Sequence, residues 1–580
     1  MPLDEREQIA TDLQNRLTSV QLKELVNMTT PDLTRKIPLI MRTDGLFAPP
    51  ITDTYELAGI LADLHGSELL RERAVREAIL ARASDEVLAE LLAASDKLAR
   101  RRHDKIEAIA GCKWTPGKKW ARTFVSALNL PACLAGTPSE SGLPALETIN
   151  PYVPLKPLHD FQVQLRDQVI EMLTDATSRR AILTLPTGAG KTRTTVEALV
   201  GYLRAQHEPS GVVLWIAQSE ELCEQAVAAF REVWTEQLIR ESQDGYLSAP
   251  RSLQIHRLWR NYSYPSEGLE PGSVVVAGMQ KLNASTEIDS LSSHVAVMVI
   301  DEAHHAIAQS YTQLLRTLDK IRRPIIGLTA TPFRGNQDES RQLIRRFHSN
   351  LIAPKLTSPM EDLRNRGILS RIVAEEHPTY SNFTLDAREL AHVQQMHDLS
   401  NSTLNRIGHD ADRNRMILAR LLNIPNGKAV LFFGCNVEHS RLIAMLLRRK
   451  GRTAASITSD TPDTMRRKWI QEFKDGTLQY LCNVGVLTTG FDAPKIEIVA
   501  IARPTASVLL YEQMVGRGMR GPANGGTEEC LLIDFTDNID NFSEPMSYTR
   551  ISQMWSESSL RVRQITQIPG GSLGETSSSQ

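Results

Sequence analysis

The sequence predicts an α/β protein with parallel sheets, preceded by a mostly helical region of about 150 residues. Short apolar runs of strand length, such as 181–185 and 295–300, alternate with helical patterns after residue 158. This alternation is typical of parallel sheets, because each crossover between parallel strands needs a long connection, usually a helix. Before residue 150, apolar positions recur every three or four residues, as in 85–94, and they predict helices.

The composition fits several packed, soluble domains. The chain has 580 residues, of which 41% are hydrophobic and 23% are charged. The formal net charge of −2 does not indicate a general polyanion binder, so any grip on nucleic acid has to come from local patches and backbone N–H groups. No uncharged apolar run approaches the ~20 residues of a membrane span, and the start of the chain is polar. We therefore expect a cytoplasmic protein that does not bind membranes.

The six cysteines are widely scattered along the sequence. They form no CxxC pair and no Cys/His cluster at the spacing of zinc ligands, which predicts reduced, mostly packed thiols. They are Cys112, Cys133, Cys223, Cys435, Cys482 and Cys530.

The helical region ends at a proline-rich stretch, 150–157, which suits a linker because proline disfavours helix in the residue before it. Within this region, 100–103 and 113–120 combine basic residues with two tryptophans, as a nucleic-acid surface can. A solvated face over two core tryptophans explains the same pattern and is the favoured interpretation.

The segment Thr184–Thr192 has the residues of a phosphate-binding loop, between a predicted strand at 181–185 and a predicted helix at 194–203. Gly188 and Gly190 allow backbone N–H groups to face phosphate oxygens at a helix N-terminus. Lys191 would reach the β- and γ-phosphates, and Thr192 would hold Mg²⁺. The loop residues assigned to nucleotide binding also include Pro186, Thr187 and Ala189. Leu185 replaces the usual first glycine, a departure typical of helicases.

A second predicted strand, 295–300, ends in two adjacent carboxylates, Asp301 and Glu302. Ligands of α/β sheets bind at the carboxyl ends of strands, so these side chains should lie beside the phosphate loop. We assign Asp301 to the Mg²⁺ shell and Glu302 to deprotonating the attacking water. His304 is expected to act in coupling rather than in chemistry.

Three later motifs, taken with these two, give the sequence its resemblance to a known family. They lie at 327–332, 487–494 and 513–520. In this order, the motifs resemble those of superfamily 2 helicases and translocases of the DEAH-box type, especially the restriction and DNA-repair branch. The resemblance covers about 158–540 and implies two tandem RecA-like motor domains with ATP in the cleft between them.

The resemblance also implies roles for the residues of these motifs. Gln513, Arg517 and Arg520 would face the nucleotide from the second motor domain, with the two arginines as arginine fingers, since a guanidinium supplies fixed donors to developing phosphate charge. Gln162 would recognise adenine. Gly490 and Asp492, in the fifth motif, would also bind the nucleotide. The residues expected to couple hydrolysis to strand movement or to contact nucleic acid are Thr329, Thr331, Gln218, Gln280, Thr488 and Thr489.

The expected division of the chain follows from these assignments. A helical accessory domain occupies 1–150, the two motor domains occupy 151–350 and 351–545, and a C-terminal extension occupies 546–580. The extension is Gly/Ser-rich after residue 569, which predicts disorder at the end. The accessory domain is a candidate surface for a protein partner.

Three functions fit the sequence. The first is an ATP- and Mg²⁺-dependent DNA helicase, and the second is a double-stranded DNA translocase that serves a restriction, repair or phage-defence complex. The third, a non-enzymatic ATP-switched clamp, predicts degenerate hydrolytic residues, whereas Glu302, Arg517 and Arg520 are all present. DNA is favoured over RNA only by analogy with the restriction and repair branch.

Overall fold

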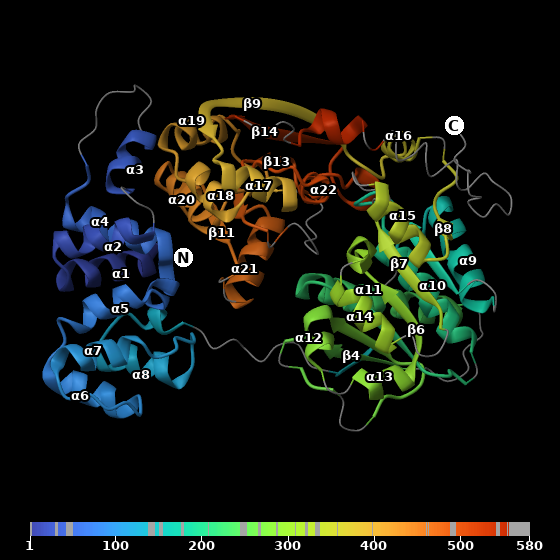
Figure 1. Ribbon diagram of the computed structural model, residues 1–580, viewed down its shortest axis with the longest axis horizontal. Helices are drawn as coiled ribbons and strands as arrows, with labels where there is room; N and C mark the ends of the chain where they lie inside the picture. The colour runs from blue at the N-terminus through green and yellow to red at the C-terminus, as the bar shows by residue number, and fades with distance from the viewer. Residues whose placement is uncertain are drawn as a thin grey trace.

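A computed structural model of the chain describes residues 3–29, 33–41, 50–136, 146–149, 155–175, 179–206, 208–243, 252–260, 262–264, 268–285, 288–307, 309–318, 323–330, 337–356, 358–396, 398–459, 461, 463–485, 487, 495–540, 546–553 and 555. Figure 1 shows a group of helices followed by two sheets with helices packed around them. We refer to these parts as the N-terminal helical domain, the first α/β domain and the second α/β domain.

The N-terminal helical domain forms because its helices carry apolar faces and polar caps. Asp53 caps α4 by accepting a hydrogen bond from the N–H of Glu56 at 2.8 Å, and Ser84 caps α6. The helices are α1 (Leu3–Arg16), α2 (Ser19–Thr29), α3 (Leu33–Met41), α4 (Thr54–His65), η1 (Gly66–Arg71), α5 (Arg73–Leu80), α6 (Asp85–Ala94), α7 (Arg102–Ala110), α8 (Lys119–Ala127) and η2 (Ala132–Ala135). The helix predicted over 85–94 is confirmed as α6.

The first α/β domain is built on an eight-stranded sheet. Its strands, in spatial order, are β1 (Leu146–Ile149), β4 (Leu253–Leu258), β5 (Val274–Gly278), β3 (Val212–Ala217), β6 (Val295–Ile300), β7 (Ile325–Thr329), β2 (Arg180–Thr184) and β8 (Leu351–Ile352). β1 pairs with β4 antiparallel, and the other neighbours pair parallel. The central strands are buried on both faces, as expected when helices cover a parallel sheet.

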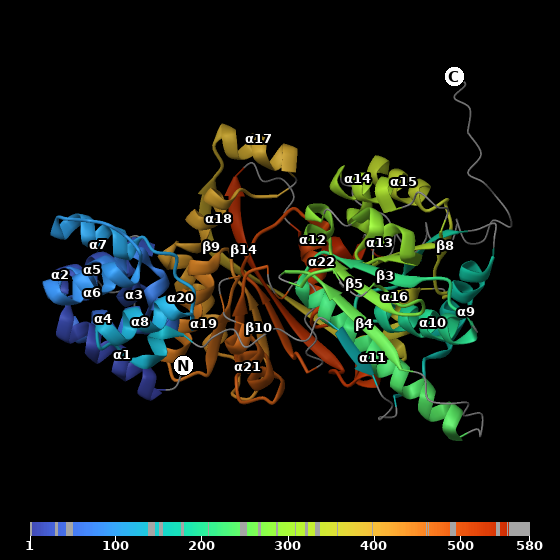
Figure 2. The same cartoon turned by 90° about the horizontal axis from the view of Figure 1, so that it is seen from below.

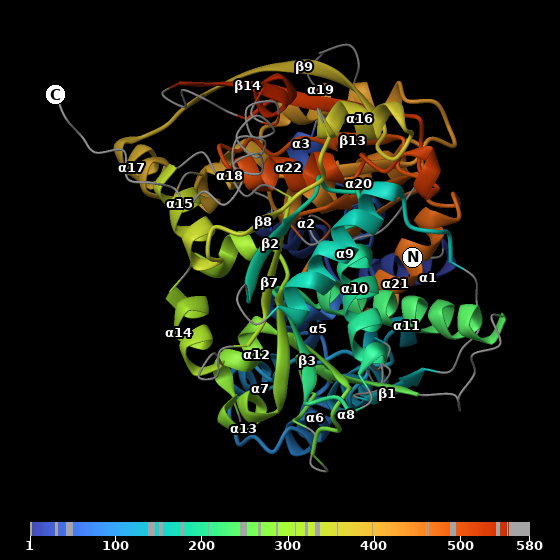
Figure 3. The ribbon, with the colours of Figure 1, turned by 90° about the vertical axis from the view of Figure 1, so that its right-hand side faces the viewer.

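Helices cover both faces of this first sheet (Figure 3). Those on one face are α9 (Asp160–Thr174), α10 (Lys191–Ala205) and α11 (Glu220–Gln243). Those on the other side are α12 (Met279–Ala284), α13 (Ile288–His294), α14 (Gln309–Leu318) and α15 (Gln337–Arg346), with η3 (Ala303–Ile307) after β6. The carboxyl ends of β2, β6 and β7 therefore meet at one edge, where the predicted site lies.

The second α/β domain contains a six-stranded parallel sheet. Its strands, in spatial order, are β11 (Ala454–Ile457), β12 (Tyr480–Asn483), β10 (Val430–Phe433), β13 (Ile498–Ile501), β14 (Glu529–Asp540) and β9 (Arg371–Thr384). The remaining helices are α16 (Pro359–Asn365), α17 (Ala387–Met396), α18 (Asn401–Gly408), α19 (Ala411–Leu422), α20 (Val437–Arg449), α21 (Asp463–Lys474), α22 (Val508–Gly516) and η4 (Pro522–Asn524). α19 precedes β10 and α21 precedes β12, as expected when helices connect parallel strands.

The N-terminal helical domain packs on the second α/β domain, far from the first (Figures 1 and 2). α3 lies against α19 and α4 lies against α20, and one apolar cluster runs through both domains. Polar contacts reinforce this joint: Arg448 donates to the carbonyl oxygen of Asp63 at 2.6 Å, and Lys450 donates to that of Met41 at 3.2 Å. The accessory helices are thus part of the second α/β domain's packing, although they are connected in sequence to the first.

Two strands lie just across the boundaries expected from the sequence. β1 precedes residue 150 and β8 follows residue 350, yet both pair within the first sheet. The cysteines are all unbridged, and four of the six are buried. In the part of the chain that the structure describes, no helix has the length and apolarity to cross a membrane.

Candidate nucleotide-binding site

The phosphate loop connects β2 to α10, as the sequence predicts. Gly188 and Gly190 have φ angles of +85° and +89°, which only glycine adopts readily. A Cβ atom built on Gly190 would lie 2.4 Å from Nε2 of Gln162, so space as well as backbone angle requires glycine there. Lys191 begins α10, and its Nζ donates to the carbonyl oxygen of Leu185 at 3.1 Å. The ammonium group therefore lies over the loop.

Gln162 joins the start of α9 to the phosphate loop. Its Nε2 donates to the carbonyl oxygen of Ala189 at 3.1 Å, and its Oε1 accepts from the N–H of His159 at 2.9 Å. The rings of His159 and Phe161 stack with centroids 5.9 Å apart. A stacked aromatic pair thus flanks Gln162, the residue that the sequence assigns to adenine recognition.

The carboxylates at the end of β6 lie in a strained turn. Glu302 has a φ of +49°, a left-handed conformation that costs a residue with a side chain on the order of 1 kcal/mol or more. Asp301 is buried, and its Oδ1 accepts from the N–H of Glu302 at 3.0 Å. Nδ1 of buried His304 lies 3.2 Å from Oε2 of Glu302, so this histidine orients the carboxylate.

The surroundings push the pKa values of the two carboxyl groups apart. Burial, together with the adjacent Glu302 charge, raises the pKa of Asp301, and the charge of Lys191 only partly offsets this. Burial also opposes ionisation of Glu302, but the hydrogen bond and charge of His304, with the charges of Lys191 and Arg517, outweigh it and lower the pKa of Glu302. Glu302 is therefore an ionised carboxylate, which can orient a water molecule and accept a proton from it.

The second α/β domain brings α22 and the residues after it against the loop. A Cβ atom at Gly516 would lie 2.5 Å from Cγ2 of Thr187, so glycine permits this close approach. Arg517, whose Nε donates to the carbonyl oxygen of Gln513 at 3.3 Å, is near enough to Glu302 to act on its pKa. The carbonyl oxygen of Arg520 accepts from Oγ of Ser370 at 2.5 Å, which fixes its backbone in the same segment.

The residues assigned to Mg²⁺ have the right chemistry for that ion. The hydroxyl of Thr192 and the carboxylate of Asp301 are hard oxygen donors. Thr192 lies in the first turn of α10, which follows β2, and Asp301 follows β6, so both residues lie at the same edge of the sheet. Mg²⁺ takes most of its ligands from water and substrate phosphates in such sites, so a large protein cage is not required. Among the described residues, no cluster of three or more His, Cys, Asp or Glu side chains could hold a metal ion.

The remaining assigned residues of the first α/β domain lie at strand ends. Thr329 ends β7, is fully buried, and its carbonyl oxygen accepts from the N–H of Leu185 at 3.4 Å, so the third motif adjoins the phosphate loop. Gln218 follows β3, and Gln280 lies in the first turn of α12. Both glutamines are exposed, as nucleic-acid contacts need to be. Their assigned role stays a prediction.

Five assigned residues lie outside the described part of the chain. They are Thr331, Thr488, Thr489, Gly490 and Asp492. In the N-terminal helical domain, Trp114 and Trp120 pack on Phe124, with ring centroids 5.4 and 6.1 Å apart, while Arg100 and Arg101 are exposed. The two tryptophans are partly buried and pack against the core, in line with the favoured interpretation.

Two contacts across the domains were not predicted from the sequence. Arg366 forms an ion pair with Asp160, and its guanidinium lies 5.4 Å from the ring centroid of Phe161. Arg466, in α21, pairs with Glu221, in α11, at 2.5 Å. Neither arginine was predicted to make a contact, because an isolated charge usually indicates a solvent-exposed face.

Comparison with known proteins identifies the family. Residues 155–334 match the family model described as Type III restriction enzyme, res subunit, and residues 413–521 match the Helicase conserved C-terminal domain. The chain belongs to the superfamily 2 helicases and translocases. In this superfamily 2 protein, the first match lies in the first α/β domain and the second match in the second, so the predicted family and the two-domain α/β architecture are confirmed.

Curated relatives of the superfamily 2 protein agree with this assignment. The "Putative ATP-dependent helicase IRC3" of Saccharomyces cerevisiae is 27% identical over 393 residues, which are 65% of this chain and 51% of the relative. A 51.5 kDa protein of a Lactococcus phage is 25% identical over 226 residues, 39% of this chain and 46% of the relative. The chain thus spans about half the length of these relatives.

Solved structures that match the chain include Dbp5 of S. cerevisiae bound to RNA and ADP BeF3. The match has a TM-score of 0.43 and a sequence identity of 13%, and it covers 71% of this chain and 98% of the Dbp5 chain. The match to the Hef helicase domain of Pyrococcus furiosus has a TM-score of 0.37 and a sequence identity of 16%. It covers 69% of this chain and 97% of the Hef chain.

Proposed function

We propose that this superfamily 2 protein is an ATP-dependent DNA helicase, which couples ATP hydrolysis to movement along DNA and to strand separation. One observation carries the proposal: Gly516 of the second α/β domain packs closely on Thr187 of the phosphate loop, and the neighbouring Arg517 acts with Lys191 of the first domain on the charge of Glu302. A hydrolytic site divided in this way is complete only when the two domains are together. Family membership supports ATP use, and the DNA substrate and unwinding belong to the proposal.

Each side chain has a role in this reaction. Lys191 and the loop N–H groups would hold the β- and γ-phosphates of ATP, and Thr192 and Asp301 would hold Mg²⁺, which neutralises phosphate charge when bound. Glu302, oriented by His304, would accept the proton of the attacking water. Arg517, with Arg520, would stabilise the charge that develops on the γ-phosphate.

Movement along DNA would follow from the division of the hydrolytic site between the two α/β domains. ATP favours the closed arrangement because both domains contact it, and product release removes that preference. Gln218 and Gln280 lie at the carboxyl ends of first-sheet strands or directly after them, where we propose that they hold the DNA backbone. A strand held by both domains would then be advanced once per cycle.

Double-stranded DNA translocation is the second candidate function. The match of residues 155–334 to a restriction-enzyme subunit favours it. A non-enzymatic clamp has less support, since the ionised Glu302 and the adjacent Arg517 are the features of an active site.

ATP hydrolysis by the purified chain tests the proposal. We would compare no nucleic acid, single-stranded DNA, duplex DNA, forked DNA and RNA, with Glu302→Gln as the inactive control. Stimulation by single-stranded or forked DNA, together with strand displacement, is the expected result. Stimulation by duplex DNA alone, with displacement of a triplex strand, would replace the helicase with the translocase, and stimulation by RNA alone would contradict DNA as the substrate.

A further inference from the structure

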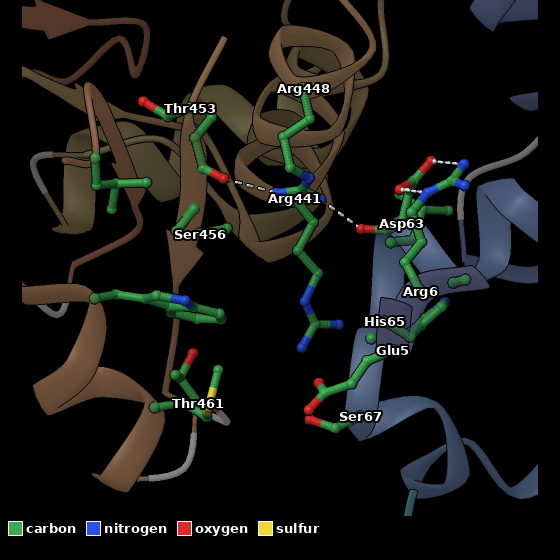
Figure 4. Close-up of a pocket in the computed structure, with 18 of the residues that line it drawn as sticks. Glu5, Arg6, Asp63, His65, Ser67, Arg441, Arg448, Thr453, Ser456 and Thr461 are labelled. Carbon is green, nitrogen blue, oxygen red and sulfur yellow. Dashed lines mark hydrogen bonds and ion pairs between the residues drawn. The ribbon is translucent and has the colours of Figure 1, made fainter. Parts of the chain in front are cut away.

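A cavity of about 750 Å³ lies between the N-terminal helical domain and the second α/β domain (Figure 4). One wall consists of the start of α1, the end of α4 and the start of η1. The other consists of β11 and parts of α20 and α21. β11 is an edge strand of the second sheet, whereas the ATP site lies between the two α/β domains. The cavity is therefore separate from the hydrolytic site.

The five arginines that line the cavity outnumber the four carboxylates that line it. Asp63 is shared by two arginines, since Oδ1 lies 2.6 Å from Nε of Arg6 and Oδ2 lies 3.5 Å from Nε of Arg449. Arg449 also lies 3.6 Å from Glu56. Arg448 donates to the carbonyl oxygens of Asp63 and Ala454, and burial lowers its pKa, an effect that the charge of Asp63 only partly offsets. These acceptors are backbone dipoles rather than charges. A partly desolvated cation in such surroundings favours an anion nearby.

Other wall groups add to this imbalance. Arg452 donates to the carbonyl oxygen of Leu422 at 2.7 Å, which is again a backbone acceptor. Figure 4 shows the side chain of Arg441 extending between the two walls, with its guanidinium toward Glu5 and Ser67. Burial, and then the charge of Arg441, lower the pKa of His65 to about 3, so this histidine is neutral at pH 7.

Carboxylates do not remove the excess of positive charge. Of those in the walls, Glu68 pairs with Arg71, and Glu472 lies 3.9 Å from Lys468. Glu5 remains as the carboxylate nearest to Arg441 in Figure 4. The cavity therefore has the charge balance of an anion site.

The remaining wall groups suit a base and a sugar. The indole of Trp469, in α21, is partly buried and lines the cavity, and aromatic rings of this kind stack on nucleobases. Hydroxyl groups are supplied by Ser67, Thr453, Ser456 and Thr461. A volume of this size is typical of sites for small organic ligands.

We propose that this cavity binds a nucleoside phosphate, with Arg441 and Arg448 on the phosphates and Trp469 on the base. The ligand is either a free nucleotide or the phosphorylated end of a strand, because both present the same chemistry. Since the walls belong to α1, α4 and η1 on one side and to α20, α21 and β11 on the other, the ligand would strengthen the joint between the two domains. The proposal does not depend on the helicase function.

Binding stoichiometry tests the site. Isothermal titration with a non-hydrolysable ATP analogue should give two equivalents for the wild-type chain, and one each for Lys191→Ala and Arg441→Ala. The double variant should give none. Arg122→Ala, on the exposed surface of α8, is the matched arginine control and should still give two. The proposal would be overturned if Arg441→Ala left the number of bound nucleotide equivalents unchanged in both the wild-type and the Lys191→Ala backgrounds.

A second variant and second probes sharpen the result. In the Lys191→Ala background, Trp469→Leu should weaken nucleotide binding at least tenfold while leaving inorganic pyrophosphate binding within about twofold. A 5′-phosphorylated oligonucleotide, compared with its 5′-hydroxyl form, tests the strand end as the source. Binding of either the nucleotide or the phosphorylated strand, lost in Arg441→Ala, supports the site. Binding of neither contradicts it. Thermal melting of each variant shows that the chain is still folded.

Discussion

At the scale of single residues, the turn after β6 concentrates the chemistry. Two adjacent carboxylates acquire opposite properties, because Asp301 is buried against a negative neighbour while Glu302 is held by His304 and faces Lys191 and Arg517. The positive φ of Glu302 shows that this arrangement is obtained at a conformational cost. Substitutions here should therefore separate binding from turnover.

Lys191→Ala and Glu302→Gln should fail at different steps. The lysine change removes the cation that holds the phosphates, so ATP binding should be lost. The glutamine keeps the shape of Glu302 but cannot accept a proton, so binding should persist while turnover falls by roughly 10²- to 10⁴-fold. Fluorescent-nucleotide binding and steady-state hydrolysis measure the two effects. Near-normal turnover in Glu302→Gln would show that another group is the base.

Arg517→Ala should lower turnover by roughly 10³-fold or more with little change in ATP affinity, since an arginine finger acts mainly on the transition state. Arg517→Lys should not restore activity, because the ammonium lacks the planar fork of donors. The measurement is kcat and KM for ATP at saturating DNA. A rise in KM at constant kcat would instead make Arg517 a ground-state binding residue.

At the scale of elements, the connection between β2 and α10 depends on backbone conformation. Its central glycines occupy left-handed angles, and Gln162 from α9 fills the space where a Cβ atom of residue 190 would be. This fit joins β2, α9 and α10 at the phosphate loop.

Gly190→Ala should therefore lose ATP affinity, and Gly476→Ala provides the matched control. Gly476 has a φ of +79° with no atom within 4 Å of an added Cβ, so it shares the backbone penalty of about 1 kcal/mol without the clash. Both variants should melt at lower temperature, but only Gly190→Ala should bind nucleotide at least tenfold more weakly. Equal nucleotide affinity in the two variants would show that the contact with Gln162 has no effect.

The elements also show which placements could be predicted from the sequence. The phosphate loop, the β6 carboxylates and the arginines after α22 were predicted because each is a short motif whose chemistry fixes its residue types and its place at a strand or helix end. The contacts of Arg366 and Arg466, and the cavity around Arg441, were not predicted. They join residues far apart in sequence, and their meeting depends on how whole domains pack rather than on a local pattern.

At the scale of the whole molecule, polar pairs such as Arg366 with Asp160 and Arg466 with Glu221 join the two α/β domains. The side chains of Arg466 and Glu221 are 13% and 22% exposed. A pair so placed contributes about 1 kcal/mol, enough to bias closure without locking it.

Arg466→Glu should raise KM for ATP about fivefold by placing two like charges across the domains. The exchange Arg466→Glu with Glu221→Arg should restore most of the loss, because the pair is re-formed with reversed polarity. Hydrolysis assays at low and high salt measure both. If the double variant is as impaired as the single one, the residues act separately rather than as a pair.

The shared core of the N-terminal helices and the second α/β domain has a consequence for synthesis of the chain. α3 ends at Met41, and its partner helix α19 begins at Ala411, about 370 residues later. At translation rates of about 5–20 residues per second, the apolar face of α3 waits roughly 20 to 75 s for the surface that covers it. The nascent chain thus carries an uncovered apolar surface while the whole first α/β domain emerges and folds, which makes this interval the period of greatest exposure to aggregation and to chaperones.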